Sequence, residues 1–248
     1  SVDTEDRVVA FDEKPAAPTS IPGKPGVALA SMGIYVFNTH FLYEQLIRDS
    51  DEPHSTHDFG KDLIPYLVPR YRVFAHRFSD SCVIGDGGEP YWRDVGTVDA
   101  YWEANIELTR VTPALNLYDH VWPIWTYQEQ LPPAKFVFDD DDRRGMAIDS
   151  LVSGGDIISG ACVRRSLLFS NVRVDNGTTI DDSVVLPGVQ IGRDVVLKNA
   201  VVDKRCVIAD GMRIGVDLEA DRRRFYVSPG GVTVVAPEQL GQNLHATR

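Results

Sequence analysis

The second half of the chain carries an aliphatic residue at every fifth or sixth position, and this repeat restricts its possible folds more than any other feature. Between residues 174 and 214 the steps are six residues, with two steps of five, so that three steps span about 17 residues. The repeating residues are Val174, Ile180, Leu186, Ile191, Leu197, Val202, Ile208 and Ile214. This pattern predicts a left-handed parallel β-helix, in which such side chains point into a triangular prism and stack in columns. In the strands of a β-sandwich, side chains alternate with a period of two, which would not produce an aliphatic repeat of five or six residues.

We expect the β-helix over residues 150–248, after a linker over residues 121–149. The linker contains the acidic turn FDDDDRRG, whose adjacent carboxylates repel one another. This turn is predicted to be a solvated loop, and no ligand spacing in it supports a metal site. A solenoid leaves two open ends that subunit contacts commonly cover, so an oligomer is expected.

Residues 1–120 show a mixed α/β pattern. Apolar runs over residues 7–11, 30–37, 72–78 and 81–85 predict strands. Residues 38–50 predict a helix capped by Asn38 or Thr39, with Leu46 and Ile47 buried. A short helix broken near Pro65 is expected over residues 60–68, and a longer one, capped by Thr97, over residues 97–111.

Charge and cysteine content exclude several classes of protein. The net charge is −11, and residues 151–248 are nearly neutral with 12 Lys and Arg against 11 Asp and Glu, so the first part is strongly acidic. An acidic first part argues against nucleic acid as a partner. No run of 18 apolar residues exists, which excludes a membrane-spanning helix. Three cysteines without CxxC spacing indicate neither a disulfide framework nor a zinc site, and they suit a reducing cytoplasm.

Three short stretches carry side chains suited to binding a sugar phosphate. Glu13 and Lys14 end an apolar run just before Pro15, where both could reach one ligand. Taken alone, such a pair is more often an exposed ion pair at the end of a strand, without a role in binding. In SMGIYVF, alternation puts Ser31 and Tyr35 on one face together with a glycine, which suits a sugar, although a buried strand fits equally well.

The third stretch is EPYWRDVGT, in which Asp94 lies in a glycine-containing loop before the helix of residues 97–111. Its carboxylate could bind Mg²⁺, which prefers oxygen ligands, and Trp92 could form an apolar wall beside it. The alternative is that Asp94 caps the following helix, as Thr97 could equally do.

Together these stretches resemble a known family. The segments FDEKP, LASMGIYVF, HDFGKDLIP, EPYWRDVGTVDAYWEAN and SLVSGGDIISG, in this order before a hexapeptide solenoid, are similar to the nucleotidyl-transferring sugar-phosphate pyrophosphorylases. Within them, YWRDVGT and LVSGG resemble the bacterial ADP-glucose pyrophosphorylases of glycogen synthesis. The resemblance implies that residues 1–120 are part of a Rossmann-like nucleotidyltransferase domain.

The implied reaction converts ATP and glucose-1-phosphate to ADP-glucose and pyrophosphate with Mg²⁺, without a covalent enzyme intermediate. Glu13 would bind sugar hydroxyls and Lys14 the phosphate of glucose-1-phosphate. Ser31 and Tyr35 would line the sugar pocket, with Asp58 and Trp92 nearby. Asp94 would be the catalytic residue that holds the metal, as one of two metal-binding aspartates.

The family's glycine-rich nucleotide loop and its first metal-binding aspartate do not occur in this sequence. We therefore expect that the 248-residue chain alone makes no ADP-glucose, and turnover by the purified chain would refute this. The resemblance also implies a cytoplasmic homotetramer regulated by phosphorylated metabolites. Candidate effector contacts are Arg173, Lys198, Lys204 and Arg205.

Three alternatives remain open from the sequence. Another sugar-1-phosphate nucleotidyltransferase would use UTP or dTTP. The second alternative is a non-catalytic regulatory subunit. Such a subunit would be expected to lose a charge at Lys14 or Asp94, and both residues are present. The third is a hexapeptide acyltransferase, which usually needs a catalytic histidine in its coils, whereas His245 is the only histidine after His120.

Overall fold

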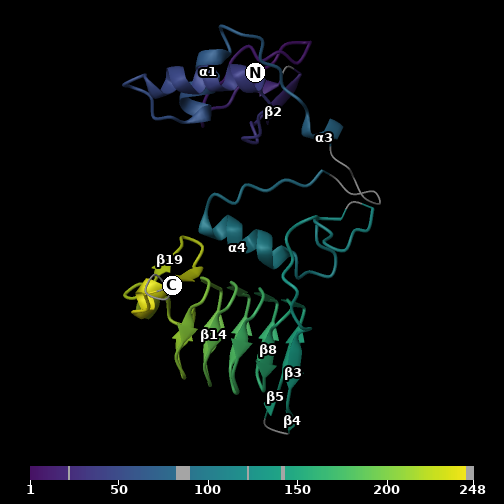
Figure 1. The fold of residues 1–248 in the computed structure, drawn as a ribbon, viewed down its shortest axis with the longest axis vertical. Helices are drawn as coiled ribbons and strands as arrows, with labels where there is room; N and C mark the ends of the chain where they lie inside the picture. Colours follow the sequence, from purple (N-terminus) through teal and green to yellow (C-terminus); the bar gives the residue numbers. More distant parts are fainter. Residues whose placement is uncertain (22, 82–89, 122, 141–142, 244–248) are drawn as a thin grey trace. The chain divides into compact units, whose positions relative to one another are not determined.

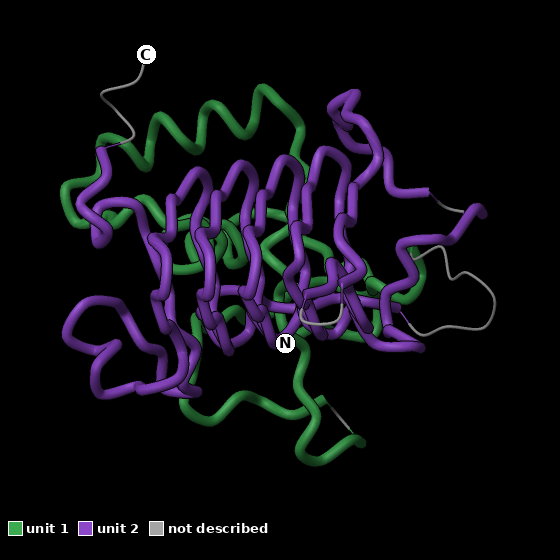
Figure 2. Tube along the Cα trace, turned by 90° about the horizontal axis from the view of Figure 1, so that it is seen from below, with its two compact units in different colours: residues 1–82 green, residues 83–248 purple. Residues whose placement is uncertain are grey.

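The structure is a computed structural model, and it describes residues 1–21, 23–81, 90–121, 123–140 and 143–243. Its contacts divide the chain into two compact units, residues 1–82 and residues 83–248 (Figure 2). The division falls inside the range 1–120 that the sequence groups together, and the predicted boundaries at residues 120 and 149 stay predictions. Each unit is described by itself. Among the described residues, no helix has the length and apolar character needed to cross a membrane.

Unit 1 consists of short helices and one hairpin (Figure 1). Its elements are the antiparallel pair β1 (Ser20–Ile21) and β2 (Lys24–Ala28), then α1 (Thr39–Ser50), the π-helix η1 (Phe59–Leu63), α2 (Ile64–Leu67) and α3 (Phe78–Ser81). The predicted helix over residues 38–50 is confirmed, and the Asn38 side chain caps it by accepting from His40 N and Phe41 N.

The predicted burial within α1 is wrong. Leu46 and Ile47 are 37% and 64% exposed, while Gln45 and Asp49 are the buried residues of the helix. Spacing locates an apolar stripe, but only the surrounding chain decides which side of a helix is covered. Asp49 is buried because the segment Ser55–His57 lies against it.

The strands predicted over residues 7–11 and 30–37 do not form among the described residues. Two isolated bridges involve the first, at Val2–Val8 and Arg7–Phe74, and Phe74 is the sole bridged residue of the predicted strand 72–78. Val36, in the second, is 97% exposed. A β-branched run forms a strand only where a neighbouring strand pairs with it, and no described segment does so here. The predicted strand 81–85 lies almost entirely outside the described residues.

The first helix of unit 2 confirms the helix predicted over residues 97–111. Helix α4 (Val98–Glu107) starts at Thr97, whose hydroxyl accepts from Ala100 N. The helix packs on the outside of the β-helix, where Trp102 Nε1 donates to the carbonyl oxygen of Asp182 at 2.7 Å. Val98, Tyr101, Trp102 and Ile106 cover Val184, Val201 and Val232.

The predicted parallel β-helix is confirmed as three sheets whose strands follow one another in successive coils (Figures 1 and 2). The first sheet contains β7 (Leu151–Val152), β10 (Leu167–Leu168), β13 (Val184–Val185), β16 (Ala200–Val202), β20 (Thr233–Val235) and β19 (Tyr226–Val227). The second contains β3 (Lys135–Val137), β8 (Ile157–Ser159), β11 (Arg173–Val174), β14 (Gln190–Ile191) and β17 (Val207–Ile208). The third contains β6 (Met146–Ile148), β9 (Cys162–Arg164), β12 (Thr179–Asp181), β15 (Val196–Lys198) and β18 (Arg213–Ile214). All pairs in these sheets are parallel except β19 with β20.

The register of the coils explains one error in the predicted repeat. Val174, Ile191 and Ile208 stack in one column, and Ile180, Leu197 and Ile214 in another, all at most 1% exposed. In the third column, however, Val185 stands over Val202, and Leu186 lies outside under α4. With Val185 in place of Leu186, stacked residues between positions 174 and 214 are 17 residues apart, since the shorter step of five always falls before the same sheet. The first coils are one residue shorter, as Leu151 with Leu167 and Ile158 with Val174 show.

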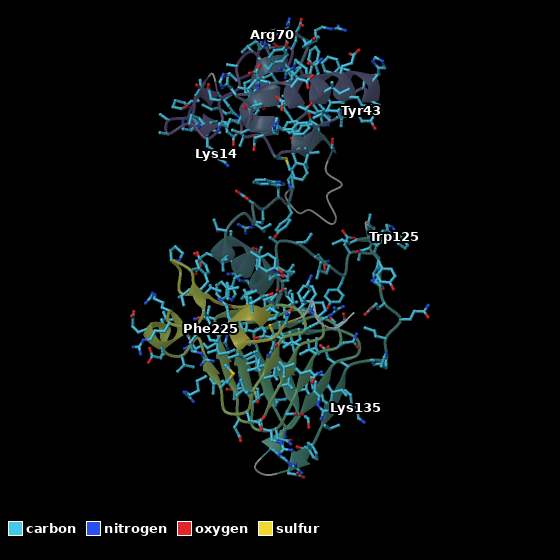
Figure 3. The ribbon with its side chains drawn as sticks, turned by 60° about the vertical axis from the view of Figure 1, so that its left-hand side comes forward. Lys14, Tyr43, Arg70, Trp125, Lys135 and Phe225 are labelled. Atoms are coloured by element: carbon cyan, nitrogen blue, oxygen red, sulfur yellow. The ribbon has the colours of Figure 1, made fainter. Side chains whose placement is uncertain are left out.

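The ends of the solenoid carry further elements. The acidic turn, predicted to be a solvated loop, forms the antiparallel pair β4 (Asp139–Asp140) and β5 (Arg143–Arg144), in which each aspartate pairs with an arginine. At the other end lie α5 (Leu218–Asp221) and a 3₁₀ turn, η2 (Pro237–Leu240). Phe225 is buried in the core there, whereas Trp125 projects from the segment before β3 and is 90% exposed (Figure 3).

Candidate functional site

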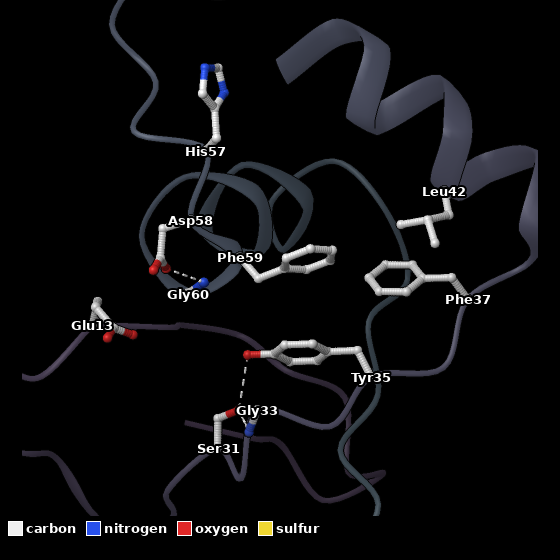
Figure 4. Close-up of a pocket in the computed structure, with 10 residues that line it drawn as sticks. All are labelled: Glu13, Ser31, Gly33, Tyr35, Phe37, Leu42, His57, Asp58, Phe59 and Gly60. Carbon is white, nitrogen blue, oxygen red and sulfur yellow. Dashed lines mark hydrogen bonds between the residues drawn. The ribbon is translucent and has the colours of Figure 1, made fainter. Parts of the chain in front are cut away.

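A pocket of about 660 Å³ opens in unit 1 and brings together four of the predicted site residues (Figure 4). These are Glu13, Ser31, Tyr35 and Asp58, which are separated by up to 45 positions in the sequence. The remaining lining residues are Gly33, Phe37, Leu42, His57, Phe59 and Gly60. The pocket therefore has carboxylates, hydroxyls and aromatic rings on its walls.

One wall is a turn over residues 31–35. Ser31 Oγ and Tyr35 Oη lie 3.1 Å apart in a hydrogen bond, and Gly33 N donates to the same serine oxygen. Gly33 has φ +70°, a conformation that favours glycine, so the chain turns here instead of continuing as a strand. Ser31 and Tyr35 do share one side, as alternation predicts, although a turn and not a strand holds them together.

The opposite wall begins at Asp58 and follows the start of η1. Asp58 Oδ1 accepts from Gly60 N at 2.8 Å and Lys61 N at 2.9 Å, which caps the helix. A Cβ added at Gly60 would lie 2.4 Å from Glu13 Oε2, so only glycine lets the Glu13 carboxylate approach this closely. The Phe59 ring stacks on that of Tyr35, with centroids 5.7 Å apart, and forms the apolar part of the pocket.

Lys14 follows Glu13 at the edge of the pocket. Its ammonium lies 3.5 Å from the Glu13 carboxylate, and its side chain is 91% exposed. Lys14 also has φ +45°, so the chain bends at this point, just before Pro15. The apolar run predicted to end at Glu13 and Lys14 therefore ends in a bend. The exposed Lys14 ammonium can turn from there toward a ligand.

The arrangement suits a sugar phosphate. Carboxylates such as Glu13 and Asp58 are strong acceptors for sugar hydroxyls, and the hydroxyls of Ser31 and Tyr35 can donate or accept. The stacked rings of Tyr35 and Phe59 offer an apolar face. Sequence reasoning missed Phe59 and Gly60, and the signal that points to them is their place directly after Asp58 in HDFGKD.

Trp92 and Asp94 belong to unit 2. Asp94 is exposed, and its Oδ1 accepts from Gly96 N at 2.9 Å. Thr97, not Asp94, caps α4, so the alternative of a helix-capping Asp94 is not what the structure has. Trp92 is 45% exposed. Its role, and that of Asp94, at the same site as Glu13 stays a prediction.

The Asp94 carboxylate fits the chemistry of a magnesium ligand. It is exposed, and Mg²⁺ in nucleotide sites usually takes one or two carboxylates together with substrate phosphates. Among the residues that the structure describes, no three His, Cys, Asp or Glu side chains form a metal site by themselves. Phosphate oxygens of a bound substrate would have to complete the coordination.

The predicted effector contacts divide between two corners of the β-helix. Arg173 begins β11, and Lys204 and Arg205 lie in the turn before β17, so these three flank one corner two coils apart. Lys198 ends β15 at another corner, beside Asp181. Arg173 Nε donates to Asp175 at 3.0 Å, which partly neutralises it.

Comparison with known proteins bears on both parts of the chain. A family model described as nucleotidyl transferase matches residues 1–111, and one described as GlmU-like, C-terminal hexapeptide, matches residues 132–235. Glucose-1-phosphate adenylyltransferase of Nitrosospira multiformis is 65% identical over 248 residues, which is 100% of this chain and 58% of that protein. Along its whole length, this chain is similar to glucose-1-phosphate adenylyltransferases.

A second example, glucose-1-phosphate adenylyltransferase of Dechloromonas aromatica, is 67% identical over 241 residues, or 97% of this chain and 55% of that protein. The chain thus spans a little more than half the length of these adenylyltransferases. The resemblance predicted from the motifs is confirmed, and so is the order of a nucleotidyltransferase part followed by hexapeptide repeats.

Proposed function

We propose that the gene product is a glucose-1-phosphate adenylyltransferase, which makes ADP-glucose and pyrophosphate from ATP and glucose-1-phosphate for glycogen synthesis. The observation that carries this proposal is the 65% identity over all 248 residues to an adenylyltransferase. The pocket lined by Glu13, Ser31, Tyr35 and Asp58 supports it, because its chemistry suits glucose.

In this proposal unit 1 binds the glucose-1-phosphate. Glu13 and Asp58 accept hydrogen bonds from sugar hydroxyls, while Ser31 and Tyr35 line the pocket beside the ring. Lys14 turns away from Glu13 to meet the phosphate, since an ammonium is a compact partner for a phosphate oxygen.

The reaction then needs no group on the protein that forms a covalent bond. A phosphate oxygen of glucose-1-phosphate attacks the α-phosphorus of ATP, a new phosphorus–oxygen bond forms, and the bond to the β-phosphate breaks to release pyrophosphate. Holding the two phosphates in line and neutralising their charge supply most of the rate. Asp94 would hold Mg²⁺, whose charge neutralises phosphate oxygens, and Trp92 would lie beside it.

We further propose a cytoplasmic homotetramer regulated by phosphorylated metabolites. The corner with Arg173, Lys204 and Arg205 is the better candidate for an anion site, because Lys198 lies at a different corner. An effector phosphate there would compete with Asp175 for Arg173.

Nucleotide choice is the decisive assay. The full-length gene product is incubated with glucose-1-phosphate, Mg²⁺ and ATP, UTP or dTTP, and the sugar nucleotide formed is quantified. We expect ADP-glucose with ATP at a rate at least about tenfold above the others. Preference for UTP or dTTP would make the protein a different sugar nucleotidyltransferase. No turnover with any nucleotide would favour a non-catalytic regulatory subunit.

A further inference from the structure

A cluster of hydrogen bonds lies behind the pocket, in the segment that leads to Asp58. Asp49, near the end of α1, is only 6% exposed, and both its oxygens accept from Ser55 Oγ at 3.0 Å. Its Oδ2 also lies 3.1 Å from His57 Nδ1. Arg48 Nη2 is the cation facing it, 3.7 Å from Oδ1. The carboxylate therefore ties two residues of the segment to the helix.

His57 has an unfavourable backbone conformation that these contacts hold in place. Its φ is +60°, in the left-handed region, which is unfavourable for a residue other than glycine. His57 N donates to Ser55 Oγ at 3.0 Å, so the same serine joins the backbone and the Asp49 carboxylate. Figure 4 shows the His57 ring directed away from Glu13 and Tyr35. The ring contacts Asp49, which does not line the pocket of Figure 4.

A second carboxylate holds the other side of the segment. Asp62 Oδ2 accepts from Thr56 N, Thr56 Oγ1 and Asp58 N at 3.1, 2.6 and 3.1 Å. These bonds, chiefly the one from the Thr56 side chain, lower the pKa of Asp62. Residues 55–58 thus lie between Asp49 and Asp62, and this fixes where the Asp58 side chain enters the pocket.

We propose that Asp49 is a positioning residue, which acts through His57 to hold Asp58 and Phe59 in the geometry that binds the sugar of glucose-1-phosphate. This inference rests on the proposed function. Asp49 sets the affinity for the sugar phosphate without touching it, and it leaves nucleotide binding unaffected.

The test uses steady-state kinetics of the full-length gene product. Asp49→Ala is expected to raise KM for glucose-1-phosphate about 5- to 20-fold, with KM for ATP and kcat within about twofold. Asp49→Asn keeps one acceptor oxygen and should raise the same KM by less. Asp51→Asn is the matched control, since it removes an exposed carboxylate just beyond α1, and it should leave KM unchanged.

A double-mutant cycle with His57 tests whether Asp49 acts through it. The Asp49→Ala/His57→Ala variant should be no worse than the poorer single variant, because both remove one interaction. His57→Asn, which tolerates a positive φ and can still donate to Asp49, should raise KM by less than His57→Ala. Additive effects of the two alanine variants would overturn the inference, as would an Asp49→Ala variant with normal KM for glucose-1-phosphate.

Failure of the proposed function gives a different result. If wild-type protein forms no ADP-glucose, or if Glu13→Gln leaves KM for glucose-1-phosphate unchanged, the function of the pocket itself is wrong. If wild-type turnover and the Glu13 effect are as expected but Asp49→Ala binds the sugar phosphate normally, only the positioning role of Asp49 is wrong.

Discussion

Single residues carry the chemistry, and their roles came from motifs more than from spacing. Taken in isolation, Glu13 and Lys14 look like exposed residues without a specific role. Ser31 and Tyr35 look like part of a strand. The resemblance grouped them with Asp58, and the structure places four of the five around one pocket. Phe59 and Gly60 follow Asp58 directly in the sequence, but their roles depend on distant segments, since Phe59 stacks on Tyr35 and Gly60 lets Glu13 approach closely.

Lys14 gives a direct test at this scale. Lys14→Ala in the full-length gene product should raise KM for glucose-1-phosphate about 10- to 100-fold, since a hydrogen bond to a charged group is worth about 1.5–3 kcal/mol. KM for ATP should change little. Lys24→Ala, at an exposed lysine in the hairpin of the same unit, is the control. Equal effects on both substrates would contradict the phosphate contact.

Asp156 predicts a pH dependence of stability. Its side chain is fully buried, and its Oδ1 accepts a hydrogen bond from Val172 N at 2.7 Å. Its Oδ2 has no hydrogen-bond partner among the described residues. Burial raises the pKa of Asp156 from 3.8 to about 7. Between about pH 4 and pH 7 the folded chain binds more protons than the unfolded chain at this group, so the free energy of unfolding falls as pH rises.

The size of this effect can be measured by urea unfolding followed by circular dichroism from pH 4 to pH 8. The difference between pKa 3.8 and about 7 corresponds to on the order of 4 kcal/mol lost across this window. Asp156→Asn removes the titrating group and should flatten the profile and raise stability at pH 8. An unchanged profile in this variant would show that other groups cause the dependence.

Whole elements differ in how well the sequence predicts them. The β-helix could be predicted because each coil repeats the same local pattern, and neighbouring coils between residues 174 and 214 are 17 residues apart. Only the phase of one column was missed, since Val185 and Leu186 are both aliphatic and α4 covers the outer one. The strands predicted over residues 7–11 and 30–37 do not form in the described part of the chain, because strand formation needs a partner strand that the local sequence does not reveal.

The turns between coils provide a prediction about stability. Gly211 and Gly215 both have a positive φ, but a Cβ at Gly215 would lie 1.6 Å from the carbonyl oxygen of Lys198, while one at Gly211 meets nothing within 4 Å. Gly211→Ala should therefore cost only the backbone strain, about 1–2 kcal/mol. Gly215→Ala should cost more than about 3 kcal/mol, because the backbone of β15 must move.

Thermal and urea unfolding of the two glycine variants give this comparison directly. A much lower midpoint for Gly215→Ala than for Gly211→Ala is the expected result. Similar midpoints would mean that the coils are not stacked as closely as the structure has them.

At the scale of the whole molecule, the chain combines in unit 1 a pocket whose lining suits a sugar with a β-helix in unit 2, and it matches adenylyltransferases along its entire length. It spans 58% of the length of the Nitrosospira protein. Adenylyl transfer is thus a property that we propose for the full-length gene product. In this proposal, the chain carries the part of the site that binds glucose-1-phosphate.

The most direct test of this account is a crystal structure of the full-length gene product with ADP-glucose bound. The account predicts the glucose ring in the pocket of unit 1, with its hydroxyls within about 3.2 Å of the Glu13 and Asp58 carboxylates. Tyr35 should lie beside the ring. Glucose bound elsewhere, with this pocket occupied only by water, would contradict the central claim.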